Sequence, residues 1–129
     1  MVAYSFNKQF IKPILAGTKQ QTIRPDRKRH ARVNEEMQLY TAMRTKYCRL
    51  IGRATCLGVA PVTIDLPDNS VKVDDNIYQG WEALDAFAQR DGFEGWLLMR
   101  AFWLEHLPDV PVFSGVLIVW RHLVPAEAI

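Results

Sequence analysis

The sequence predicts a mixed α+β domain in which about six strands form a small barrel or a strongly curled sheet, with three helices inserted between them. Strand-like stretches are spread over the whole chain, and segments with apolar residues at helical spacing separate them. The chain has 129 residues, 49% of them hydrophobic, which is enough for one domain with its own core. Because no repeat or composition break divides it, we expect a single domain over residues 1–129.

The first predicted elements are a short strand and a helix. Residues 3–6 suit a strand, and Asn7 can cap a helix over about residues 8–16. Pro13 is unfavourable in the middle of that helix and would shorten or kink it. Gly17 stands where a helix-ending glycine is expected.

Three groups capable of chemistry follow in the segment GTKQQTIR: the amine of Lys19, the hydroxyl of Thr22 and the guanidinium of Arg24. We expect a strand over about residues 20–24. Residues three apart in a regular strand point to opposite faces. Lys19 and Thr22 can therefore share one site only if Lys19 lies in the turn before the strand, or if a bulge intervenes. We predict the turn.

The charge of the chain is divided along its length. Residues 19–53 carry ten Lys or Arg against three acidic residues, which gives +7, whereas residues 54–129 carry four against eleven, which gives −7. Such a basic region, which includes a predicted loop over 25–34, suits a phosphate-bearing partner, although a charge run can equally be a solvated loop. The candidates for substrate or RNA binding in it are Arg24, Arg27, Arg29, Tyr40 and Arg44.

The rest of the chain completes the mixed pattern. Strands are expected at 37–42, 49–65, 71–73 and 112–122, and helices at 81–90 and 95–106. Gly58 and Pro61 are expected to bend or split the longest strand. Asp91 suits a functional site and a helix-end turn about equally. The apolar stripe of the last helix is expected to be core: Trp96, Phe102 and Trp103.

The sequence gives no sign of a cofactor or metal. Cys48 and Cys56 are too few for a disulfide framework and form no C-x-x-C pair, so we expect reduced thiols, one or both buried in strands. The histidines are dispersed, and no glycine-rich phosphate loop occurs. The first residues do not show the charged-then-apolar order of a signal peptide, and no apolar run reaches the ~18 residues of a membrane span. We therefore expect a cytoplasmic protein with no membrane contact. The oligomeric state stays open.

Four segments resemble the ASCH domain: FIKPILAGTKQQTIR with the basic loop after it, MQLYTAMRTKYCRLIG, ALDAFAQRDGF and the closing strand. The similarity covers nearly the whole chain, and ILAGTKQQTIR is its most specific part. It implies a PUA-like fold (pseudouridine synthase and archaeosine transglycosylase), a small β-barrel of about six strands with helices packed at its ends. ASCH proteins have been linked to RNA binding, and some small bacterial members are amidohydrolases that remove the acetyl group from N4-acetylcytidine.

The resemblance also implies site residues. In those enzymes a lysine and a threonine of this segment act with a later acidic residue, which implies catalytic roles for Lys19, Thr22 and Asp91. Asp91 is one methylene shorter than the glutamate of the enzymes.

Lys19 and Thr22 form a chemically plausible device for amide cleavage. A threonine hydroxyl is a weak nucleophile until a base takes its proton. Lysine can be that base only if its pKa falls well below about 10.4, and burial or nearby positive charge lowers it. Asp91 could assist at the leaving nitrogen, whereas a tight ion pair with Lys19 would raise the lysine pKa. A backbone N–H of residues 17–19 is the expected oxyanion donor.

Three functions follow from these observations. The first is an amidohydrolase for N4-acylated cytosine nucleosides, which the match at Lys19 and Thr22 favours. The second is a non-catalytic module that binds single-stranded RNA, and the third is a ribonuclease with Lys19 or Tyr40 as its base. The basic excess favours RNA, because a free nucleoside carries no phosphate. Salt separates them, since RNA affinity falls steeply with ionic strength.

Overall fold

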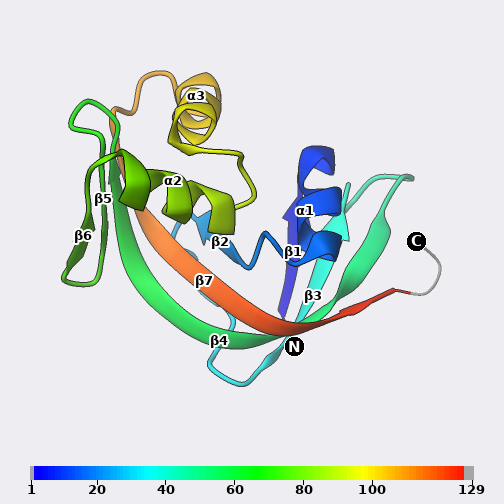
Figure 1. Cartoon of the computed structure of the whole chain (residues 1–129). Helices are drawn as coiled ribbons and strands as arrows, with labels where there is room; N and C mark the ends of the chain where they lie inside the picture. The colour runs from blue at the N-terminus through cyan, green and yellow to red at the C-terminus, as the bar shows by residue number, and fades with distance from the viewer. Residues whose placement is uncertain (1, 127–129) are drawn as a thin grey trace.

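The computed structural model describes residues 2–126, in which one mixed sheet of seven strands and three α-helices make up the α+β fold (Figure 1). The strands are β1 Val2–Phe6, β2 Gln21–Arg24, β3 Glu36–Thr41, β4 Arg49–Asp65, β5 Ser70–Val73, β6 Asn76–Tyr78 and β7 Val112–Pro125. The helices are the 3₁₀ turn η1 Lys8–Phe10 and the α-helices α1 Ile11–Ala16, α2 Trp81–Arg90 and α3 Trp96–His106.

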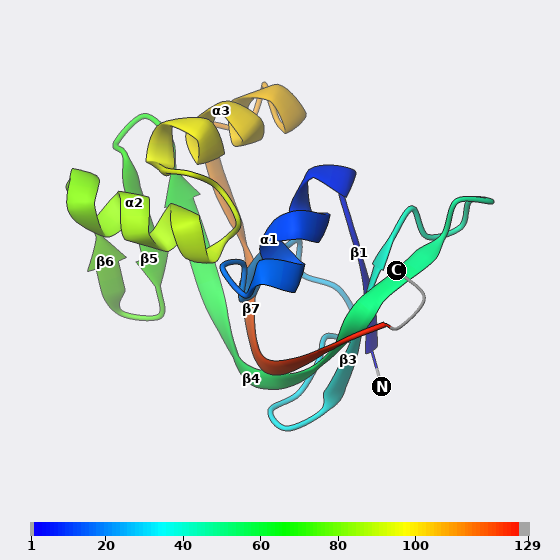
Figure 2. The ribbon, with the colours of Figure 1, turned by 45° about the vertical axis from the view of Figure 1, so that its right-hand side comes forward.

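The sheet is curled but open. Its strands follow the order β1-β3-β4-β5-β6, and β7 pairs with both β4 and β2. The long strands β4 and β7 run side by side in one curve, and the helices lie on its concave side (Figures 1 and 2). The predicted α+β class and strong curl are confirmed. Within residues 2–126, however, the strands do not close into a barrel, because β1 and β6 remain as edges.

The longest strand bends without splitting. The register of β4 with β7 shifts between Arg53 and Thr55 and again between Cys56 and Gly58, and such bulges bend a strand. The predicted bend near Gly58 is therefore confirmed, whereas β4 stays paired through Pro61. Cys56 is buried in this strand, as expected, but Cys48 is exposed before it. The sequence missed β6, which has only three residues and no buried one.

The first helix accommodates its proline by its position. Pro13 is the third residue of α1, where an N–H would have no partner within the helix. The three residues before α1 form the 3₁₀ turn η1, and Asn7 Oδ1 accepts a hydrogen bond from the N–H of Gln9 at 3.3 Å. Gly17 ends the helix with φ 82, as predicted, and turns the chain toward β2.

The core is apolar with two charged exceptions. Its largest fully buried side chains include Trp96, Tyr4 and Phe87. Lys19 is only 2% exposed and Asp91 only 5%, although charged side chains are rarely buried unless they are partnered. No helix within residues 2–126 is long and apolar enough to cross a membrane. These two buried charged residues mark a candidate functional site.

Candidate functional site

Polar and aromatic side chains meet around one cavity of about 190 Å³, which we call the aromatic cavity. Its polar lining residues are Ser5, Asn7, Lys19, Thr22, Arg24 and Asp91. Its apolar lining residues are Phe6, Phe10, Ile23, Phe93, Phe102 and Trp103. They come from β1, η1, β2, the turn after α2, and α3. The volume is below the ~300–1,000 Å³ of drug-sized sites, so it suits a small ligand or one ring of a larger one.

Lys19 lies in the turn before β2, as the spacing to Thr22 predicts. Its N–H donates to the carbonyl of Pro13 at 3.0 Å, which fixes the turn on the end of α1. Its Nζ donates to the backbone carbonyl of Asp91 at 2.5 Å and lies 4.5 Å from the ring centroid of Phe10. The amine is thus held between the ends of two helices against an aromatic ring.

This setting lowers the pKa of Lys19 to about 8. Burial is the largest cause, since a cation in a dry interior loses its hydration, and the positive charge of Arg24 adds to it. The carboxylate of Asp91 opposes the shift without reversing it. At pH 7 about one Lys19 side chain in ten is therefore neutral, which is the form that a base requires.

Asp91 caps the C-terminal end of α2, which confirms the expectation of a residue in a helix-end turn. The same residue also lines the aromatic cavity. Burial raises its pKa to about 6, against the influence of Lys19, Gln21 and Arg24. Asp91 Oδ1 accepts a hydrogen bond from Gln21 Nε2 at 3.3 Å. Because Lys19 bonds to the backbone carbonyl of Asp91, the carboxylate is left to Gln21 and the cavity.

Thr22 and Arg24 point from β2 toward the same cavity, two residues apart on one face of the strand. Arg24 Nε donates to Thr22 Oγ1 at 3.0 Å, so the threonine hydroxyl hydrogen remains free for a base. Arg24 Nη2 donates to the carbonyl of Ser5 at 2.7 Å, and its guanidinium lies 4.8 Å from the ring centroid of Phe6. Burial lowers the pKa of Arg24 to about 10, which leaves it charged at neutral pH.

A second hollow of about 210 Å³ adjoins the aromatic cavity, and we call it the arginine hollow. Its lining residues are Ala3, Tyr4, Ser5, Arg24, Arg27, Met43 and Arg44. It therefore collects three of the predicted binding residues. The other two lie outside both spaces: Arg29 pairs with Glu35, and Tyr40 donates a long hydrogen bond of 3.4 Å to Gln38 Oε1.

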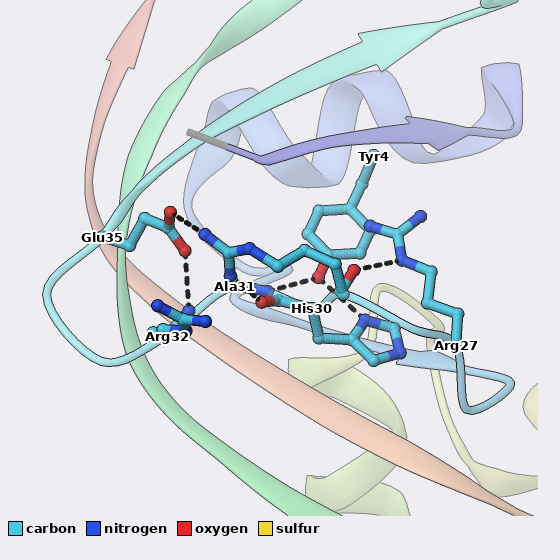
Figure 3. Close-up of polar contacts among 7 residues, drawn as sticks. Tyr4, Arg27, His30, Ala31, Arg32 and Glu35 are labelled. Atoms are coloured by element: carbon cyan, nitrogen blue, oxygen red, sulfur yellow. Dashed lines mark hydrogen bonds and ion pairs between the residues drawn. The ribbon is translucent and has the colours of Figure 1, made fainter.

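The basic loop after β2 is ordered by its own polar contacts (Figure 3). Tyr4 Oη accepts from the N–H of Ala31 at 3.0 Å and shares a hydrogen bond with His30 Nδ1 at 3.0 Å. Arg27 Nε donates to the carbonyl of Arg29 at 2.8 Å, and its guanidinium lies 4.6 Å from the ring centroid of Tyr4. Residues 25–29 are all exposed, and these contacts hold Arg27 beside the site.

Two expectations are corrected here. The backbone N–H groups of residues 17–19 cannot act as oxyanion donors, because all three donate to the carbonyls of Ile14 or Pro13.

The apolar stripe of α3 does not belong to the core along its whole length. Trp96 is fully buried, but Phe102 and Trp103 line the aromatic cavity, and the buried Nε1 of Trp103 has no hydrogen-bond partner within residues 2–126.

Sequence reasoning also missed residues that shape the site. Ser5 and Phe6 come from β1, and Gln21 orients Asp91. Gly92 has φ +98 and packs against Lys19. The glycine directly after Asp91 was a usable signal, but the positions on β1 carry none, because only the folded sheet brings them to β2. Within residues 2–126, no group of three His, Cys, Asp or Glu side chains could hold a metal ion.

Comparison with known proteins identifies the fold. No protein-family model matches the sequence, and no curated protein sequence matches it. The crystal structure of ASCH from Zymomonas mobilis is similar, with a TM-score of 0.58 and 13% identity over 95% of this chain and 68% of that one. Two variants of the same protein agree. A serine-to-alanine variant gives 0.57, with 17% identity over 97% and 70% of the two chains. A tyrosine-to-phenylalanine variant gives 0.56, with 16% identity over 95% and 70%. The chain therefore has an ASCH-like fold.

Proposed function

We propose that the chain is an amidohydrolase that removes the acyl group from N4-acylcytidine-type substrates. One observation carries the proposal: Lys19 and Thr22, from the turn and strand at β2, converge with Asp91, from the end of α2, on one small aromatic cavity. Buried titratable groups with displaced pKa values are typical of catalytic sites, and here the lysine pKa falls to about 8 while the aspartate pKa rises to about 6.

The reaction assigns one role to each residue. Neutral Lys19 takes the proton of Thr22 Oγ1 as the oxygen attacks the acyl carbon. The bond between that carbon and N4 then breaks, and protonated Lys19 returns the proton to the leaving nitrogen. Water cleaves the resulting acyl-threonine ester with Lys19 again as base. The Asp91 carboxylate binds the base edge, and Arg24 stabilises negative charge on the acyl oxygen.

The aromatic lining suits the substrate. Planar pyrimidine rings pack well against aromatic side chains, and Phe6, Phe10 and Phe102 all line the cavity. A cavity of about 190 Å³ suits the base and its acyl group, while the ribose would lie toward its opening.

The proposal is tested by the turnover of N4-acetylcytidine, followed by ultraviolet absorbance. Lys19→Ala and Thr22→Ala should each lower kcat by about 10³-fold or more. Lys72→Ala and Thr63→Ala are matched controls on β5 and β4, remote from the cavity, and should retain activity. Turnover that persists in Thr22→Ala would exclude this mechanism. No turnover by the unaltered protein would favour the RNA-binding module, which steeply salt-dependent binding of single-stranded RNA would support.

A further inference from the structure

We propose that the arginine hollow is an anion subsite that binds a phosphate group of the substrate whose base occupies the aromatic cavity. The inference rests on the proposed function for the identity of that base. It extends the substrate class from free nucleosides to phosphate-bearing cytidine compounds.

The two spaces are adjacent and share lining residues. Ser5 and Arg24 line both the aromatic cavity and the arginine hollow. Arg24 reaches into both, because its Nε bonds Thr22 on one side and its Nη2 bonds the carbonyl of Ser5 on the other. A ligand with its base in the first space would thus place a neighbouring group in the second.

Among the described residues, no carboxylate pairs directly with the cations of the hollow, although Asp91 attracts Arg24 over a longer distance. Within residues 2–126, no carboxylate lies within ion-pair distance of Arg24, Arg27 or Arg44, whereas Arg29 and Arg53 do have such partners. Arg27 is close enough to Arg24 that its positive charge helps to lower the pKa of Arg24. Like charges held together without an anion carry an electrostatic cost that a bound anion removes.

Two of the three arginines are held by contacts within the protein. The contacts in Figure 3 hold Arg27 over the ring of Tyr4, which is itself only 1% exposed. Arg44 reaches the hollow from the turn after β3, in which Ala42 and Arg44 both have left-handed backbone conformations, with φ 54 and 66. Arginine thus reaches the hollow from β2, from the loop after it and from this turn.

Phosphate is the anion that this chemistry fits. The planar guanidinium group matches phosphate oxygens with paired N–H donors. A phosphate monoester carries about −1.5 to −2 charges at pH 7, which suits three cations better than a single carboxylate does.

The test compares the binding of cytidine and cytidine 5′-monophosphate by isothermal titration calorimetry. The unaltered protein should bind the monophosphate at least about ten-fold more tightly, and the ratio should shrink as salt rises. Arg27→Ala and Arg44→Ala should each move the ratio toward one, while Arg27→Lys should keep part of it. Arg53→Ala removes an arginine that lines neither space and should keep the full ratio. Equal affinity for the two ligands, or a ratio unchanged in both alanine variants, would overturn the subsite.

Two further arms separate the sources of phosphate and the two proposals. A cytidine trinucleotide without terminal phosphates tests whether the subsite takes a phosphodiester of RNA, and an Arg27- and Arg44-dependent gain with either ligand supports the subsite. If the protein hydrolyses N4-acetylcytidine but shows no preference for the monophosphate, the subsite proposal alone is wrong. If it prefers the monophosphate, loses that preference in the arginine variants and hydrolyses nothing, the amidohydrolase proposal alone is wrong.

Discussion

Gly92 leaves the space in which the Lys19 side chain lies. A Cβ at residue 92 would come within 2.8 Å of Lys19 Cδ and 3.0 Å of Phe10 Cδ1. The backbone there also has φ +98, which side chains other than glycine rarely adopt. The position therefore links the end of α2 directly to the placement of the amine.

Gly92→Ala should destabilise the protein and displace Lys19. Gly80 is a matched control, because it has φ +81 but nothing lies within 4 Å of its built Cβ. Gly80→Ala should cost about 1–3 kcal/mol from backbone strain alone. Gly92→Ala should cost about 1–3 kcal/mol more through overlap, and it alone should lower kcat. Urea unfolding and N4-acetylcytidine turnover measure both, and equal losses in the two variants would contradict the contact.

Replacements at Thr22 should separate its hydroxyl from its shape. Thr22→Val keeps the volume but removes the proposed nucleophile, so kcat should fall by about 10³-fold or more. Thr22→Ser keeps the hydroxyl and should retain measurable turnover. Activity in the valine variant near that of the serine variant would show that the hydroxyl is not the nucleophile.

The pH dependence of kcat/KM should follow Lys19. The amine must be neutral to act as a base, so activity should rise with pH and level off above about 8. Asp91→Asn removes a charge that raises the lysine pKa and should move the midpoint down. Arg24→Gln removes a charge that lowers it and should move the midpoint up. Titration of ¹³C-labelled Lys19 by NMR gives the same two shifts independently of rate, and shifts of the same sign would refute the assignment.

The buried pair should cost stability near neutral pH. The folded state holds the lysine proton less tightly than the unfolded chain, so stability rises as pH rises from about 8 to 10.5. Asp91 behaves oppositely: its raised pKa means that stability is lost as pH rises from 3.8 to about 6. Between about pH 6 and pH 8 both side chains are mostly charged, so this is the range in which their burial destabilises the folded state most.

Lys19→Met combined with Asp91→Asn should therefore stabilise the inactive protein by about 1–4 kcal/mol at pH 7, even though the Asp91 carbonyl loses its donor. The gain should shrink at pH 4 and pH 10. Urea unfolding at the three pH values checks this. A double variant less stable than the parent at pH 7 would contradict it.

Local features of the fold followed from the sequence, whereas the shape of the site did not. Three local features depend only on a few neighbouring residues: the turn at Gly17, the position of Lys19 before β2 and the helix end at Asp91. Residue spacing and turn chemistry were therefore enough to predict them. The roles of Ser5 and Phe102 depend on pairings that span most of the chain. An apolar stripe on α3 looks the same whether it faces core or cavity.

The grouping of the candidate residues shows the same limit. A run of basic residues does not say which members meet, and only the folded loop separates Arg27 from Arg29. The oxyanion expectation failed for a related reason: the N–H groups of the turn were already used to end α1.

The pairing of β2 with β7 sets the order in which the site can arise during synthesis. Thr22 and Arg24 stand opposite Ile118 and Val116, so β2 has no sheet partner until almost a hundred further residues have left the ribosome. Phe102 and Trp103 join the cavity just before that strand. A nascent chain therefore carries Lys19 and Thr22 long before the rest of the cavity forms around them, and the candidate site would be completed in one late step.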